Sequence, residues 1–101
     1  MDERQLVYSL LKKVPKGKVT TYKELGVAAG VHQRTVAAYM KANVDPSRVP
    51  CFRVIMESGD IGGYGFLGPK NKEMLLREDG IEVIDGKVPK KYVHRFHVNS
   101  F

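Results

Sequence analysis

The chain lacks several features, and each absence excludes a class of protein. Its 101 residues include a single cysteine, Cys51, so no internal disulfide can form and a reducing compartment is expected. No apolar run approaches a membrane span, and the start, Met1-Asp2-Glu3-Arg4, lacks the basic and apolar stretches of a secretion signal. The sequence therefore predicts a cytoplasmic, globular protein with one modest core and no segment that spans a membrane.

Acidic residues are in the minority. Lys and Arg number 17 against 11 Asp and Glu, which gives a net charge of +6 and a pI near 9.6. Such an excess favours a polyanionic partner, either nucleic acid or an anionic membrane surface. Many small proteins carry a similar excess only as a solvated basic surface, so charge alone does not choose between these readings.

Apolar residues recur at helical spacing through the first half of the chain. The expected helices span about residues 6–14, 25–29 and 33–42; a capping box at 21–24 opens the second, Gly30 ends it, and Asn43 in a left-handed conformation ends the third.

Two short helices joined by a tight glycine-containing turn are typical of a helix-turn-helix, whose second helix enters a DNA groove. The exposed face of that helix would carry Arg34, Thr35, Ala38 and Lys41. The small residues allow close approach, and the two cations can meet phosphates. The same pattern also fits a simple helical hairpin whose alanines pack against the core.

The second half predicts short β elements and one more helix. A buried strand is expected at 52–56, a turn at 57–60, a helix at about 70–79 with Met74, Leu75 and Leu76 facing inward, and a turn at Asp85-Gly86. Between them, the glycine-rich loop 61–69 suits the lining of a pocket better than a core. The fold class expected is mostly α with short β elements, a winged-helix-like DNA-binding domain.

The C-terminal segment 87–101 is basic and aromatic. It fits either an arm that tracks DNA or a strand docked on the body, and composition does not decide. His94 and His97 form an incomplete set for a structural metal site, so no metal is expected.

Cys51 lies in the segment Val49-Pro50-Cys51-Phe52-Arg53-Val54. A cysteine attacks as the thiolate, and a neighbouring Arg is a setting that lowers a thiol pKa. The alternative is that Cys51 is simply a small buried hydrophobe, since free cysteine is among the most buried residue types.

Ordered segments of the chain resemble the alkylguanine-DNA alkyltransferases, a family that repairs methylated guanine by moving the alkyl group onto its own cysteine. The matching segments cover about residues 5–85: Thr21-Tyr22 with Glu24-Leu25, the run 34–40, Asn43 eight residues before Cys51, the motif 49–54, the loop 59–64 and the helix 72–80. Ordered matches at near-family spacing are more specific than one motif.

The resemblance implies roles for the matched residues. Cys51 would accept the alkyl group, with Arg53 and Asp79 completing the catalytic set. Arg34 would fill the space left by a flipped nucleotide, and Tyr22 would press on the adjacent 3′ phosphate. The base pocket would be lined by Asn43, Pro50, Tyr64 and Gly65.

The resemblance further implies a monomer that acts on double-stranded DNA containing alkylated guanine, has no membrane partner and uses no cofactor. Residues 1–86 would form the catalytic and DNA-binding domain, and 87–101 an extension. At two positions the chain departs from the family pattern: Phe52 replaces a proton-accepting His, and Asp79 replaces the Glu that holds it. Three hypotheses follow: a single-use methyltransferase, a lesion-binding protein without transfer, or a helix-turn-helix regulator.

Overall fold

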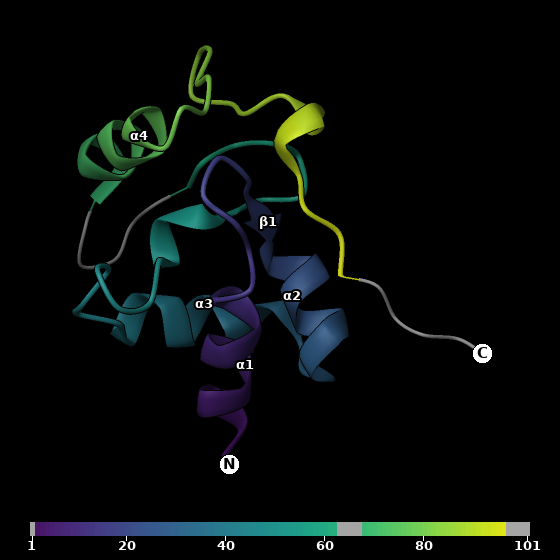
Figure 1. Cartoon of the computed structure of the whole chain (residues 1–101). Helices are drawn as coiled ribbons and strands as arrows, with labels where there is room; N and C mark the ends of the chain where they lie inside the picture. Colours follow the sequence, from purple (N-terminus) through teal and green to yellow (C-terminus); the bar gives the residue numbers. More distant parts are fainter. Residues whose placement is uncertain (1, 63–67, 97–101) are drawn as a thin grey trace.

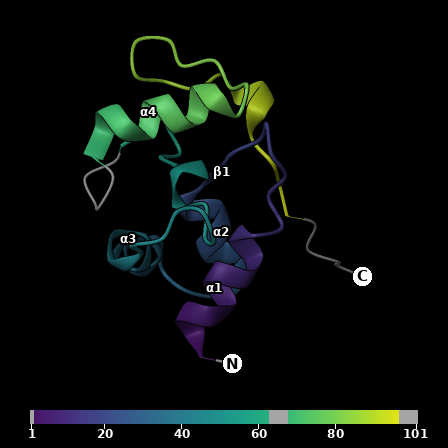
Figure 2. The same ribbon diagram turned by 60° about the vertical axis from the view of Figure 1, so that its left-hand side comes forward.

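The computed structural model describes residues 2–62 and 68–96, and within them the fold is mostly helical, as predicted (Figure 1). The elements in chain order are α1 (Glu3–Leu11), β1 (Thr20–Thr21), α2 (Tyr22–Ala29), α3 (Gln33–Ala42), the 3₁₀ turn η1 (Cys51–Arg53), β2 (Val54–Ile55), α4 (Gly68–Glu78) and the 3₁₀ turn η2 (Lys90–Tyr92). Helices α1 to α3 lie on one side of β1, and α4 lies on the other (Figures 1 and 2).

Helix α1 is capped at its start and ends before the predicted Val14. Asp2 accepts a hydrogen bond from the amide of Gln5, and the Gln5 side chain accepts one from the amide of Asp2. The helix ends at Leu11 because the chain then tightens: the amides of Lys13 and Val14 donate to the carbonyls of Leu10 and Leu11, three residues back. Pro15 also disfavours a helical conformation at Val14. Val14 nevertheless stays in the core, 1% exposed.

The helix-turn-helix interpretation agrees with how α2 and α3 pack. Thr21 caps α2 by accepting from the amide of Glu24, so the helix begins at Tyr22, and Gly30 ends it with a positive φ of 75°. A Cβ on Gly26 would lie 2.6 Å from the carbonyl oxygen of Val31. Only glycine therefore allows the turn to approach α2 this closely.

The end of α3 differs from the prediction. The helix spans Gln33–Ala42 as expected, but Asn43 is extended, with φ −74° and ψ 124°, and is not a left-handed cap. Its side-chain amide instead donates to the carbonyl of Val49 at 2.8 Å. This bond requires the chain to leave α3 in extended form and turn back toward η1.

A parallel sheet of two strands, each two residues long, joins the two halves of the molecule. Thr20 pairs with Val54 and Thr21 with Ile55. The predicted strand 52–56 is shorter than expected because the carbonyls of Pro50 and Cys51 accept from the amides of Arg53 and Val54, which closes a 3₁₀ turn. The sheet therefore holds the start of α2 beside the end of η1.

The core consists of two clusters. The helical cluster contains Val7, Leu11, Val14, Leu25, Val36, Met40, Val49, Cys51 and Val54. The C-terminal cluster contains Val19, Phe52, Ile55, Ile61, Leu76, Ile81, Val83 and Val88.

Helix α4 packs on the C-terminal cluster through a face shifted from the predicted one. Leu76 is fully buried and Leu75 half-buried, but Met74 is 52% exposed, so its predicted inward position is wrong. Lys72 occupies the inward position one turn before Leu76 and is 3% exposed. Sequence periodicity misplaced the face because a lysine is not expected inside.

The turn at Asp85-Gly86 forms as predicted, with both residues at positive φ. The following segment docks on the body over residues 87–96. Val88 is buried, and Val93 pairs with Val19 in a parallel bridge. In Figure 2 the yellow C-terminal segment accordingly runs beside the loop before β1. Of the two alternatives left open by composition, these residues fit the docked one.

Candidate active site

Cys51 lies at the junction of the two clusters. The thiol is in the helical cluster, whereas the ring of its neighbour Phe52 packs in the C-terminal cluster, and each residue is 8% exposed. The 3₁₀ turn η1 sends these two side chains into different cores. The side chain at position 52 therefore lies in an apolar cluster that is different from the cluster of the Cys51 thiol.

Lys72 is a buried cation beside this junction, and the sequence analysis missed it. Its Nζ donates to the carbonyl oxygen of Val54 at 2.6 Å and to the hydroxyl of Tyr22 at 3.4 Å. It also lies 5.6 Å from the centre of the Tyr22 ring. The signal that marks it is a lysine on the α4 face that carries Leu75 and Leu76.

The site is electrostatically coupled. Burial lowers the pKa of Lys72 to about 8, and the charge of a Cys51 thiolate opposes this shift. Burial likewise raises the pKa of Tyr22, and the same thiolate adds to the effect. Lys72 and Cys51 therefore interact electrostatically across the junction of the two clusters.

Arg53 and Asp79 form a bidentate ion pair. Arg53 Nε lies 2.7 Å from Asp79 Oδ2 and Nη2 lies 3.3 Å from Oδ1, while Nη1 donates to the carbonyl of Val14. The guanidinium also stacks over the Phe52 ring at 5.2 Å. Arg53 thus connects η1, the loop after α1 and Asp79, the first residue after α4.

Asn43 and Pro50 position the segment that leads to the thiol. Asn43 is buried, its amide donates to the Val49 carbonyl, and its Oδ1 accepts from the amide of Asp45 at 3.3 Å. Pro50 is buried directly before η1. Both predicted pocket residues therefore lie around the backbone that carries Cys51.

Four of the five predicted DNA-contacting residues share α3, whereas the fifth, Tyr22, is the half-buried first residue of α2 and its hydroxyl accepts from Lys72. Arg34, Ala38 and Lys41 are exposed, and Thr35 is half-buried. The opposite face of α3 is fixed to α1, because the hydroxyl of Tyr8 donates to the Tyr39 carbonyl. The helix is therefore held firmly while its outer face stays open.

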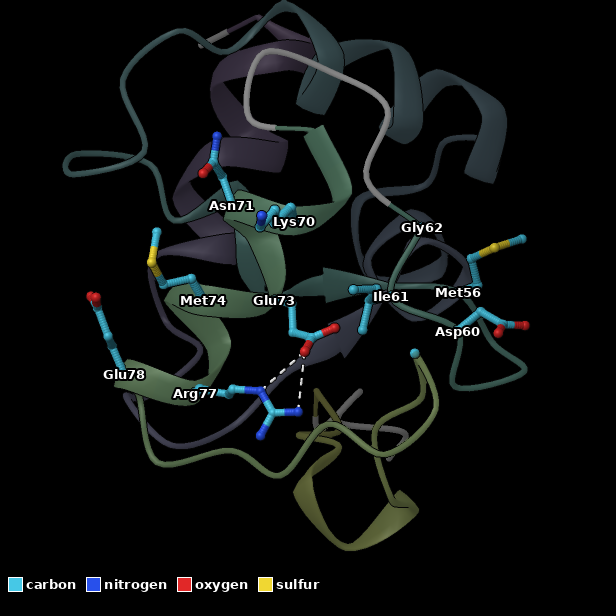
Figure 3. Close-up of a pocket in the computed structure, with 11 residues that line it drawn as sticks. Met56, Asp60, Ile61, Gly62, Lys70, Asn71, Glu73, Met74, Arg77 and Glu78 are labelled. Carbon is cyan, nitrogen blue, oxygen red and sulfur yellow. Dashed lines mark hydrogen bonds and ion pairs between the residues drawn. The ribbon is translucent and has the colours of Figure 1, made fainter.

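Tyr64 and Gly65, predicted to line the base pocket, lie outside the described residues. A cavity of about 1020 Å³ lies between α4 and residues 56–62, and Figure 3 shows its lining residues, among them Met56, Ile61 and Met74. Neither Cys51 nor Tyr22 lines it. This cavity is therefore distinct from the surroundings of the thiol.

Within residues 2–62 and 68–96, no cluster of three or more His, Cys, Asp or Glu side chains is arranged to hold a metal. Among the helices of that part of the chain, none has the length and apolar character needed to cross a membrane.

Residues 2–81 match the family model of the 6-O-methylguanine DNA methyltransferase DNA-binding domain. The chain belongs to this family. The resemblance noted in the sequence is thereby confirmed, and the match includes Cys51, Lys72 and the Arg53–Asp79 pair.

Individual members of this family are similar to the chain. A bifunctional methyltransferase/endonuclease from Picrophilus torridus is 42% identical over 103 residues, covering 100% of this chain and 33% of the relative. The structure of the O6-methylguanine-DNA methyltransferase of Pyrococcus kodakaraensis matches with a TM-score of 0.72 and 38% identity, covering 80% of this chain and 47% of that one.

Schizosaccharomyces pombe Atl1, in complex with damaged DNA containing O6-carboxymethylguanine, matches with a TM-score of 0.84 and 27% identity. That match covers 92% of this chain and 94% of Atl1. By contrast, the chain spans only 33% and 26% of the first two curated relatives.

Proposed function

We propose that this chain binds duplex DNA containing O6-alkylguanine and transfers the alkyl group to Sγ of Cys51, once per protein molecule. The single observation that carries the proposal is the nucleophile Cys51 at the junction of the two clusters, coupled to the buried ammonium of Lys72. Family membership and the exposed outer face of α3 support the same conclusion.

The proposed reaction is a direct displacement. The Sγ thiolate attacks the alkyl carbon, an S–C bond forms, the C–O bond breaks, and its electron pair stays on the guanine oxygen. The proton given up by Cys51 balances the proton that the restored guanine takes up. The thioether product has no route back to the thiol, so each molecule acts once.

Reaching the alkyl carbon requires the nucleotide to leave the base stack. Arg34 is exposed near the start of α3, which supports assigning it to the vacated space. Small neighbours such as Ala38 let the helix approach the DNA backbone closely.

Lys72 supplies the activation that Phe52 cannot. A fixed cation near the thiol would stabilise the negative charge on the sulfur that attacks the alkyl carbon. The ammonium of Lys72 is fixed by the Val54 carbonyl, so it needs no reorganisation when the thiolate forms. Arg53 is neutralised by Asp79 and contributes mainly by holding η1 in place.

Intact mass tests this proposal directly. Incubation with a duplex bearing one O6-methylguanine should add about 14 Da to the peptide containing Cys51, the mass of one methylene. The stoichiometry should reach one alkyl group per protein and stop. An unmodified duplex serves as the control, and binding of the lesion duplex with no change in mass contradicts transfer.

A second candidate, lesion binding without transfer, has specific support. Phe52 replaces the proton-accepting residue implied by the family resemblance, and the match to Atl1 extends over nearly the full length of both chains. The mass experiment separates the two, because this candidate requires tight lesion binding with an unmodified Cys51.

A further inference from the structure

Most of the positive charge lies away from α3. Besides Arg34 and Lys41 on that helix, the chain carries a group of lysines on two segments that are distant in sequence. We define the lysine patch as Lys16, Lys18, Lys90 and Lys91, all exposed. Lys12 and Lys13 precede it in the same loop and are exposed too.

The patch is built on a fixed backbone. Val19 donates to the Tyr92 carbonyl at 2.9 Å, and His94 donates back to the Val19 carbonyl at 2.6 Å. Lys18 Nζ donates to the carbonyl of Lys91 at 3.4 Å, which joins the two segments directly. Val19 is fully buried beneath them. The lysines therefore project from a surface that is already ordered.

The patch is poorly neutralised. Of its four lysines, Lys91 alone has an acidic partner among the described residues, Glu82 at 3.2 Å. Glu82 also accepts from the hydroxyl of Tyr92. Four positive charges against one carboxylate make a surface that attracts a polyanion.

The position of the patch excludes a simple extension of the α3 surface. In Figure 2, α3 lies at the left of the molecule, whereas the loop before β1 and the yellow turn η2 lie at the right. The principal extents are 37 × 29 × 21 Å. A duplex docked on α3 would have to bend strongly around the body to reach the patch, which costs deformation energy.

We propose that the lysine patch holds the phosphate backbone of a second duplex while α3 engages the first. Lysines act as point charges that neutralise phosphates, and the patch offers no Arg, Asn or Gln to read base edges. Binding there is independent of sequence and steeply dependent on salt. It gives the protein a way to pass between DNA segments. The proposal rests on the proposed binding of lesion DNA at α3.

The test is capture of a second duplex. A biotinylated duplex with one O6-methylguanine is immobilised and loaded with protein, and a fluorescent unmodified duplex is then added. Lys16→Gln with Lys90→Gln should weaken capture about tenfold near 0.1 M salt and lower the salt slope by about 1.8, or about 0.9 for each lost phosphate contact. Loading on the first duplex should stay within about twofold.

Lys70→Gln with Lys87→Gln is the matched control, because both lysines are exposed and the net charge falls by the same two units. This control should capture the second duplex within about twofold of the wild type. Equal losses in both variants, or unchanged capture in the patch variant, overturn the proposal.

Two further outcomes are informative. The captured complex should contain one protein and two duplexes by sedimentation, and a complex of two proteins overturns the proposal. Binding of phosphatidylserine vesicles without capture of a second duplex assigns the patch to membranes and also overturns it. Failure to load on the lesion duplex at all is a separate result, which contradicts the proposed function.

Discussion

The part of the molecule around α1 to α3 and the part around α4 differ in where they hold their charged side chains. Around α1 to α3, apolar side chains fill the core, and the candidate DNA-binding groups Arg34 and Lys41 stand in solvent. Around α4, the candidate site takes polar groups into the interior: Lys72 and the Arg53–Asp79 pair. Recognition by exposed cations costs the fold little, whereas buried charges destabilise it unless they are paired.

The largest effect is expected from Cys51, at the junction of the two clusters, where transfer and binding should respond differently. Cys51→Ser should abolish alkyl transfer, because a hydroxyl is far less nucleophilic than a thiolate near neutral pH. Binding of the lesion duplex should stay within about threefold, since serine differs by one atom. Mass spectrometry and a binding titration on the same preparation measure both, and transfer by the serine variant removes Cys51 from the mechanism.

Breaking the buried ion pair should damage the C-terminal half most. Asp79→Asn leaves Arg53 charged and half-paired, with a loss of about 3 kcal/mol in the free energy of unfolding. Glu73→Gln is the control, because it breaks an exposed i,i+4 pair and should cost no more than about 0.5 kcal/mol. Urea titration compares them, and equal losses would mean that the Arg53–Asp79 pair has no special weight.

Lys72 should show opposite effects on activity and stability. Lys72→Met should slow transfer about 100-fold at neutral pH by removing a fixed cation. Burying the ammonium costs about 3 kcal/mol, and the Val54 carbonyl loses a donor worth about 2, so the variant should be about 1 kcal/mol more stable.

The pH dependence provides the check on Lys72. Its folded pKa of about 8 lies below the usual 10.5, so the unfolded chain binds more protons between these values. The stability of the wild type relative to Lys72→Met should therefore rise from pH 8 to pH 10.5. A flat difference across this window would show that the lysine is not buried in its charged form.

Phe52→His tests whether the relay can be restored. The ring is 8% exposed among aliphatic side chains, so an imidazole there should cost about 2 kcal/mol of stability, while transfer should not accelerate. Phe52→Leu controls for the lost volume. Asp79 is held by Arg53 and is not free to orient the imidazole. Faster transfer with a shifted pH profile would contradict the claim that a residue at position 52 cannot accept the proton of Cys51.

The smallest effect is expected on the α3 face. Arg34→Ala should reduce the preference for lesion over normal duplex about tenfold, because in the proposed function Arg34 fills space only when a nucleotide is flipped out. Lys41→Ala should instead weaken both duplexes alike, as the loss of one phosphate contact does. Competition binding measures the preference, and identical behaviour of the two variants would reduce Arg34 to a plain electrostatic role.

Local patterns predicted the three helices α1 to α3 and some of their bounds. The bounds of α3 follow from its amphipathic spacing, and the end of α2 from Gly30, whereas α1 ends at Leu11 and α2 begins at Tyr22, both earlier than expected. The conformation of Asn43 was beyond such reasoning, since it depends on a hydrogen bond to Val49 that only the folded loop provides.

The site in the C-terminal half was less accessible from sequence. Cys51 was found by its context, but Lys72 was missed, because its role arises from contacts with Val54 and Tyr22, 18 and 50 residues away. The pairing of Arg53 with Asp79 across 26 residues was likewise not visible. Tertiary contacts between distant segments carry this information, and periodicity does not.

The short sheet of β1 and β2 also limits where residues can be inserted or deleted during evolution. Thr21 precedes α2 directly, and Val54 follows η1 directly, so their pairing leaves no slack on either side. An insertion at either place would shift Cys51 relative to α3. The stretch between Asn43 and Val49 is also fixed in length, because the Asn43 amide donates to the Val49 carbonyl and the Val49 amide donates to the Asp45 carbonyl. Length variation among homologues should therefore spare the two strands and this stretch.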